Sequence, residues 1–95
     1  SKFTKGEWEN IVVDTNSGYF HKVVTEGESI CNITTRNLER AEANAKLIAA
    51  APELLEVCLT AKAMYEAQGI KTDSMIGGEQ YSKLLSAIKK ATGYV

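Results

Sequence analysis

The fold is decided by the stretch SICNITTRNLERAEANAKLI, residues 29–48, because its pattern changes from strand to helix part-way along. Up to Thr34 the residues are mostly β-branched or small and polar, and they suit a strand. From Leu38 onward, apolar residues recur at three- and four-residue steps, which is helical spacing. Thr35 and Asn37 lie at the change, and their side-chain oxygens can cap the first helical turn. We therefore predict a strand that leads directly into a helix.

Two further strands precede this stretch. The predicted strands span residues 10–14, 19–25 and 29–34. Turn-forming clusters rich in Gly, Asn, Ser and Glu separate them, which predicts an antiparallel three-stranded meander. Residues of the second strand alternate between two faces, yet neither face is cleanly apolar. Mixed faces fit a sheet covered by helices on one side and partly by another subunit on the other.

The rest of the chain has helical patterning. A first helix is predicted for residues 38–50, where Pro52 ends or kinks it, because proline lacks an N–H group. Proline also suits the start of a helix, so a second helix can begin there and end at Gly69. Whether residues 38–68 form two helices or one kinked helix is open at this stage. A last helix is predicted for residues 79–92.

These patterns predict an α+β fold in which an N-terminal antiparallel three-stranded meander is followed by two or three α-helices packed on one face. The 95 residues are expected to form a single domain, β-rich over residues 1–35 and helical over residues 36–95. A chain of this size buries only about 60–65% of its unfolded surface. Oligomers bury surface that a small monomer cannot, so we expect a homo-oligomer.

Charge and composition limit the partners and the location that we expect for the protein. Lys plus Arg (11) nearly balance Asp plus Glu (12), for a net charge of -1. This balance argues against nucleic acid or a membrane surface as a partner. The chain shows no apolar run near 18 residues and no signal-peptide pattern, so we expect a cytoplasmic protein without a membrane span. Cys31 and Cys58 are expected to be reduced.

Candidate catalytic and cofactor residues are sparse. His21 is the only histidine, and with Cys31 or Asp14 it could form a nucleophile and base pair. Such a pair needs a third group to orient the base, and a single strand histidine is more typical of a structural residue. One histidine and two distant cysteines cannot supply four zinc ligands, and no phosphate-loop motif is present. We predict no enzyme, no metal and no cofactor.

One constellation is a candidate ligand site. Thr35, Arg36, Asn37 and Arg40 lie where the third strand meets the first helix. Free N–H groups and the positive end of the helix dipole favour anions there. The two arginines could add bidentate contacts to a phosphate or carboxylate. The alternative is ordinary helix capping beside two surface arginines.

Three segments resemble small phage and prophage proteins of unknown function. Residues 42–56, EANAKLIAAAPELLE, are similar to a recurrent signature of those proteins. Gly6-Glu7-Trp8 is similar to their N-terminal Gly-x-Trp, and residues 88–93, IKKATG, to their C-terminal ending. The resemblance implies a phage-encoded accessory protein that works in a bacterial cytoplasm, and it implies no catalytic residues.

Two functional hypotheses follow. The first is a non-enzymatic accessory protein that acts by binding in the host cytoplasm, as in counter-defence. It would block a host protein or sequester a small anionic ligand such as a nucleotide signal. The second is a small DNA-binding regulator, for which the helix over residues 79–92 is the candidate recognition helix.

Overall fold

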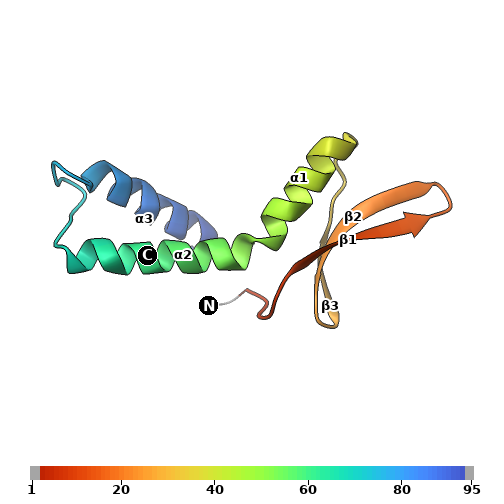
Figure 1. The fold of residues 1–95 in the computed structure, drawn as a ribbon, viewed down its shortest axis with the longest axis horizontal. Helices are drawn as coiled ribbons and strands as arrows, with labels where there is room; N and C mark the ends of the chain where they lie inside the picture. The colour runs from red at the N-terminus through yellow and green to blue at the C-terminus, as the bar shows by residue number, and fades with distance from the viewer. Residues whose placement is uncertain (1–2, 94–95) are drawn as a thin grey trace. The chain divides into compact units, whose positions relative to one another are not determined.

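A computed structural model of the chain describes residues 3–93, which fall into two compact units. The sheet unit is residues 3–52, and the hairpin unit is residues 53–93. The expectation of a single domain stays a prediction. The elements, labelled in Figure 1, are β1 (Glu9–Thr15), β2 (Gly18–Thr25), β3 (Glu28–Asn32), α1 (Leu38–Ala49), α2 (Ala51–Ala67) and α3 (Gly78–Thr92).

The predicted meander and α+β class are confirmed. The three strands form one antiparallel sheet in the order β1-β2-β3. Val12 pairs with His21 across the first ladder, and Val23 pairs with Cys31 across the second. The third strand ends two residues earlier than predicted. After Asn32 the Ile33 N–H still donates to the His21 carbonyl oxygen at 2.9 Å, and the chain then leaves for α1.

The core of the sheet unit is a thin layer between α1 and β2. His21, Val23 and Thr25 alternate along β2 and are all buried. Ala41 and Ala45 are the buried residues of α1, which packs on β2 and β1. Small alanine side chains let a helix backbone approach a sheet closely. The layer is therefore tight around Val23, whose side chain is 0% exposed.

The open question about residues 38–68 is answered: α1 and α2 are separate helices. Ala50 lies between them with φ -86° and ψ -4°, and its N–H points to the carbonyls of Leu47 and Lys46. Pro52 occupies the first turn of α2, where a missing N–H breaks no helical bond. Proline thus starts the second helix, which is one of the two readings that the sequence allowed.

The hairpin unit holds α3 beside α2 (Figure 1). The rings of Tyr65 and Tyr81 meet edge to face, with centroids 6.0 Å apart. Ile88 lies about two turns after Tyr81 on α3 and is 2% exposed. Tyr81 and Ile88 therefore lie on the inner face of α3. In contrast, no residue of α2 is fully buried.

Two glycines shape the loop between these helices. Gly69 has φ +75° and ends α2, and the N–H groups of Gly69 and Ile70 bond back to the carbonyls of Glu66 and Tyr65, both at 3.0 Å. This is the Schellman arrangement that glycine favours. Gly78 begins α3 so close to the loop that a Cβ there would lie 2.9 Å from the carbonyl oxygen of Thr72. The loop is packed closely against the start of α3.

Candidate functional site

The predicted anion site lies at the start of α1. Asn37 is the N-cap residue, and its side-chain oxygen accepts a hydrogen bond from the Arg40 N–H at 3.0 Å. The Ala41 N–H is taken by the Asn37 backbone carbonyl at 2.9 Å. Asn37 therefore already acts as a cap: the Ala41 bond is the first regular bond of the helix, and the Arg40 N–H, one of the free groups that an anion would use, is occupied.

Thr35 is engaged in a second contact of this segment. Its hydroxyl oxygen accepts from the Asn44 side-chain amide at 3.4 Å, a long hydrogen bond to a residue nearly two turns into α1. Asn44 is a polar residue near the apolar positions of α1. The contact with Thr35 gives its side chain a hydrogen-bond partner, which the sequence alone did not reveal. It also ties the chain before α1 to the helix, so the strand-to-helix connection is held at both Thr35 and Asn37.

Arg36 and Arg40 complete the four predicted residues, and both are exposed. Neither makes an ion pair among residues 3–93, whereas Lys46, Lys62 and Lys83 each pair with a glutamate four residues away. The structure therefore brings the four residues into one short segment, with the two guanidinium groups in solvent. Exposed charges attract an anion weakly, and salt screens that attraction.

His21 is buried under α1 and has a structural partner. Its Nδ1 lies 3.2 Å from the Asn10 side-chain oxygen, and its ring meets Tyr19 edge to face at 6.1 Å. An amide oxygen only accepts, so this contact places the ring proton on Nδ1. The hydrogen-bond partner is therefore an amide, in place of the Cys31 thiol or Asp14 carboxylate that a nucleophile and base arrangement would use.

A polar cluster that sequence reasoning missed joins α2 to α3. The Tyr81 hydroxyl donates to Glu66 Oε2 at 2.6 Å, and Lys62 Nζ lies 3.0 Å from the same oxygen. The hydrogen bond from Tyr81, followed by the contacts with Lys62, lowers the pKa of the Glu66 carboxyl. The same bond raises the pKa of Tyr81, because the carboxylate holds the phenol proton. The four-residue spacing of Lys62 and Glu66 is visible in the sequence, but Tyr81 comes from another helix.

A shallow groove lies beside this cluster. Its volume is about 420 Å³, and its lining residues are Glu66, Gly69, Ile70, Lys71, Thr72, Tyr81 and Leu85. The carboxylate that faces it is already bonded to a phenol and an ammonium group. A ligand there would have to displace Tyr81 or Lys62 from the Glu66 carboxylate. The cluster therefore offers little capacity to bind a ligand, and its bond between Glu66 and Tyr81 holds α2 and α3 together.

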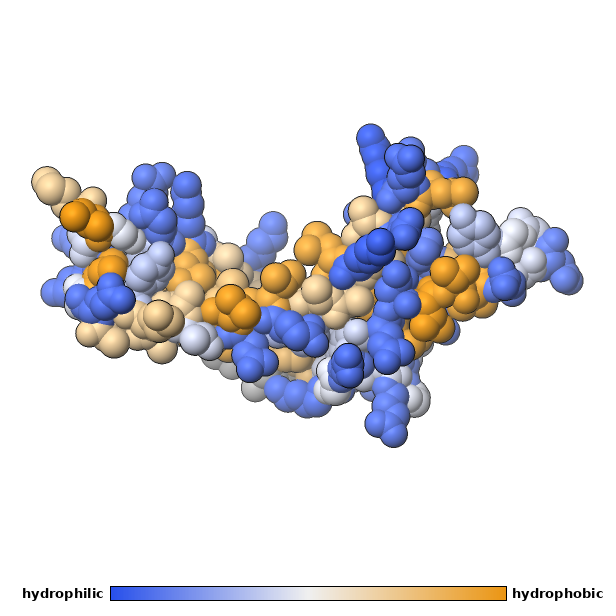
Figure 2. Space-filling view, in the orientation of Figure 1, coloured by the Kyte–Doolittle hydropathy of each residue, from blue (hydrophilic) through white to orange (hydrophobic). Residues whose placement is uncertain are grey.

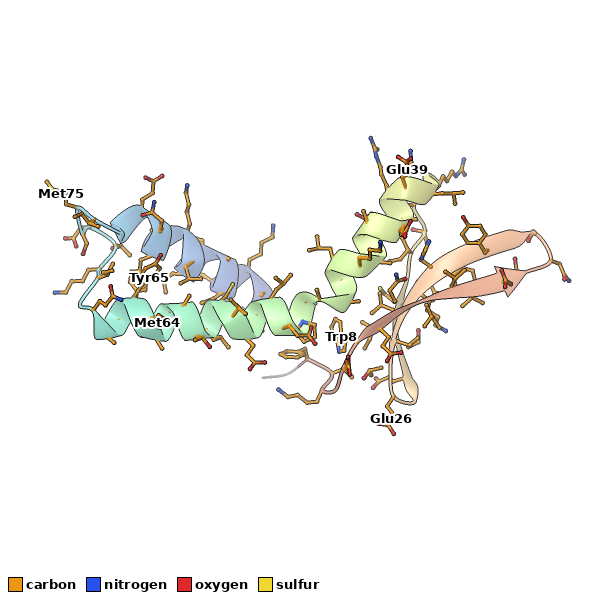
Figure 3. The ribbon with its side chains drawn as sticks, viewed as in Figure 1. Trp8, Glu26, Glu39, Met64, Tyr65 and Met75 are labelled. Atoms are coloured by element: carbon orange, nitrogen blue, oxygen red, sulfur yellow. The ribbon has the colours of Figure 1, made fainter. Side chains whose placement is uncertain are left out.

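The outward side of α2 carries exposed apolar residues. Val57 is 66% exposed and Met64 is 59% exposed, and both line a groove of about 420 Å³ together with Glu53, Glu56, Thr60 and Ala61. Met64 is labelled on α2 in Figure 3, and Figure 2 shows apolar residues along this helix. Met75 and Ile76, at the tip of the following loop, are also almost fully exposed. We call Val57, Thr60, Ala61 and Met64 the α2 face.

The N-terminal segment is held by its own aromatic residues. The Trp8 indole N–H donates to the Thr4 carbonyl at 3.1 Å, and its ring meets Phe3 edge to face at 6.2 Å. Lys5 Nζ lies 4.5 Å above the Phe3 ring. Gly6 passes so close to β2 that an added Cβ would lie 2.7 Å from the Thr25 hydroxyl oxygen. Trp8 thus orders the segment that leads into β1.

The sequence also matches one known family. The family described as Salmonella phage P22 protein Y8K6 matches residues 1–95. The chain belongs to this family. The Y8K6 match covers the full length and confirms the expectation of a phage protein, while the particular signature read in residues 42–56 stays a prediction. Neither the curated proteins nor the solved structures contain a match to the chain.

Two observations bear on metals and membranes. Over residues 3–93, no three His, Cys, Asp or Glu side chains come together as possible metal ligands. Within the same range, no helix combines the length and the hydropathy that crossing a membrane requires. Cys31 and Cys58 are half-buried and form no disulfide with each other, and the expectation that they are reduced stays a prediction.

Proposed function

We propose that this Y8K6-family chain is a non-enzymatic phage accessory protein that acts by binding a host protein in the bacterial cytoplasm. The observation that carries the proposal is the α2 face. A helix on the surface of a soluble protein normally has a polar outer side. Here Val57 and Met64 remain largely exposed on the side away from the helix contact with α3. Apolar surface of this kind marks interaction sites.

The test is capture of a host protein from a lysate of the phage's bacterial host. The bait is the full chain, compared with the double variant Val57→Glu and Met64→Glu. A control variant, Ala63→Glu, places the same charge at an exposed position on another side of α2. Enrichment of the same host protein by the unmodified chain and by the control, with loss in the double variant, is the expected result. Equal capture by all three baits would reject the α2 face, and no specific capture would reject host-protein binding.

A second version of the proposal is sequestration of a small anionic ligand, such as a nucleotide signal. It is supported by Arg36 and Arg40 beside the start of α1, which have no ion-pair partner among residues 3–93. Native mass spectrometry of protein purified from bacterial cytoplasm would detect the ligand as extra mass that is lost on denaturation. Its absence from a variant with Arg36→Ala and Arg40→Ala would place the ligand there. Equal ligand mass in both proteins would exclude the site.

The alternative of a DNA-binding regulator depends on α3. Lys83 on this helix is paired with Glu79 at 3.3 Å, while Lys89 and Lys90 lie in its last turn. Lysines in that position also complement the helix dipole without any DNA. Tight duplex binding that weakens steeply with salt would favour a regulator. No binding at low salt would exclude it.

We also propose that the protein works as a homo-oligomer. The buried apolar side chains among the described residues are few: Val23, Ala41, Ala45, Tyr81 and Ile88. Many larger apolar residues are exposed in both units. Association of copies would bury part of this surface and add to the stability of a small chain.

A further inference from the structure

The sheet has two edges, and they differ. β1 and β3 are the outer strands, so each presents a row of backbone N–H and C=O groups without a strand partner among the described residues. Natural sheets protect such edges with short strands, charges, proline or bulges. β3 is protected in this way. It has only five residues, and its ladder with β2 carries a register shift between Val23 and Val24.

β1 is less protected, because its two charged residues, Glu9 and Asp14, lie toward its ends and its central three residues are apolar. It has seven residues and pairs with β2 without a register shift, from Glu9 opposite Val24 to Thr15 opposite Gly18. It contains no proline and no lysine. Val12 at its centre is 54% exposed, and apolar residues gather over β1 and β2 in Figure 2. An apolar edge strand of this length is a template for another strand.

The sequence of β1, ENIVVDT, is self-complementary. Reading outward from Val12 in either direction gives one apolar residue and then two polar residues. Antiparallel pairing of two copies centred on Val12 places Val12 opposite its own copy and Ile11 opposite Val13. The outer pairs are Asn10 with Asp14 and Glu9 with Thr15, so no two like charges are opposed.

Other registers are worse. A shift of two residues keeps each side chain on its face but places Val13 opposite Glu9 in one direction and Val12 opposite Asp14 in the other. Parallel pairing in register would place Glu9 and Asp14 beside their own copies, which is unfavourable. The antiparallel register centred on Val12 is therefore the one that matches apolar with apolar and polar with polar residues throughout.

We propose that two copies of this chain pair through β1 in that register and form a continuous six-stranded sheet. The inference rests on the homo-oligomer proposed above and names its interface. The two-fold axis passes through Val12, so both copies of α1 lie on the same face of the joined sheet. The opposite face then combines the Ile11, Val13 and Phe20 positions of both copies.

The experiment uses the full chain and two charged variants, Val12→Lys and Val12→Glu. Sedimentation velocity should give twice the 10.4 kDa monomer mass for the unmodified chain and the monomer mass for each variant alone. The axis places residue 12 opposite its own copy, so a mixture of the two variants should form a heterodimer of doubled mass. Circular dichroism would confirm that each variant keeps its folded spectrum, as expected for a half-exposed position.

Several results would overturn this interface. A monomeric unmodified chain would remove it together with the homo-oligomer. Persistent oligomers in both single variants would leave a homo-oligomer but exclude β1. Loss of the dimer in each variant without recovery on mixing would exclude the register centred on Val12. The variant with Val57→Glu and Met64→Glu should remain dimeric, so that loss of host-protein capture and loss of this dimer are separate outcomes.

Discussion

Replacement of Val23 by alanine tests whether the layer between α1 and β2 is the core of the sheet unit. The Val23 side chain is 0% exposed. Removing two buried carbon atoms costs about 1.6 kcal/mol at roughly 0.8 kcal/mol each. A cavity adds to this cost when neighbours cannot collapse into it. The residues that α1 buries here, Ala41 and Ala45, have no side-chain torsions with which to do so. We expect a total loss of about 2–3 kcal/mol.

The assay is urea unfolding followed by the fluorescence of Trp8, the only tryptophan, which lies in the same unit. With a slope near 1–3 kcal/mol per molar urea, the midpoint should fall by roughly 0.7–3 M. Protein concentration is held constant, because self-association shifts apparent stability. Leu38→Ala, at a position 54% exposed, is the control and should change little. A loss below about 0.5 kcal/mol for Val23→Ala, with the slope unchanged, would refute the assignment of this core.

Three further changes test other contacts. Asn37→Ala removes the cap of α1 and should cost about 1 kcal/mol, measured by thermal unfolding, with Asn37→Asp nearly neutral. Gly78→Ala should destabilise by about 1–3 kcal/mol despite the better helix propensity of alanine, because its Cβ would meet the Thr72 carbonyl; a stabilised variant in urea unfolding would contradict this close approach. Tyr81→Phe should move the pKa of Glu66 back up toward its ordinary value, as read by NMR titration, with Lys62 still holding it partly down. Because the pKa of Glu66 is lowered in the folded state, the ionised carboxylate stabilises the fold above the unfolded pKa of 4.5, and this stabilisation is lost as the pH falls through the folded-state pKa. The loss of stability at acid pH should therefore be smaller in Tyr81→Phe.

Much of the candidate site at the start of α1 could be predicted locally. The capping role of Asn37 follows from its side chain and from the change of period after it. The bond between Thr35 and Asn44 could not be predicted, because it depends on the path of the chain between β3 and α1. The contact of Tyr81 with Glu66 was equally hidden, since it requires α3 to return alongside α2.

The sequence by itself determined the kinds of element and their order. Alternation and β-branched residues indicate the strands, three- and four-residue spacing indicates the helices, and Pro52 marks the start of α2. These signals are local, because they arise from backbone conformations that neighbouring residues set together.

Only the tertiary structure decided which apolar surfaces are covered. α1 covers one face of β2 around Val23, while β1 remains an edge strand with Val12 exposed, and α2 keeps Val57 on its outer side. Whether an apolar residue is buried depends on which element packs against it in the fold. The apolar spacing along the sequence is the same whether or not another element covers those residues. The two surfaces proposed for binding, the α2 face and β1, are visible for this reason only in the folded protein.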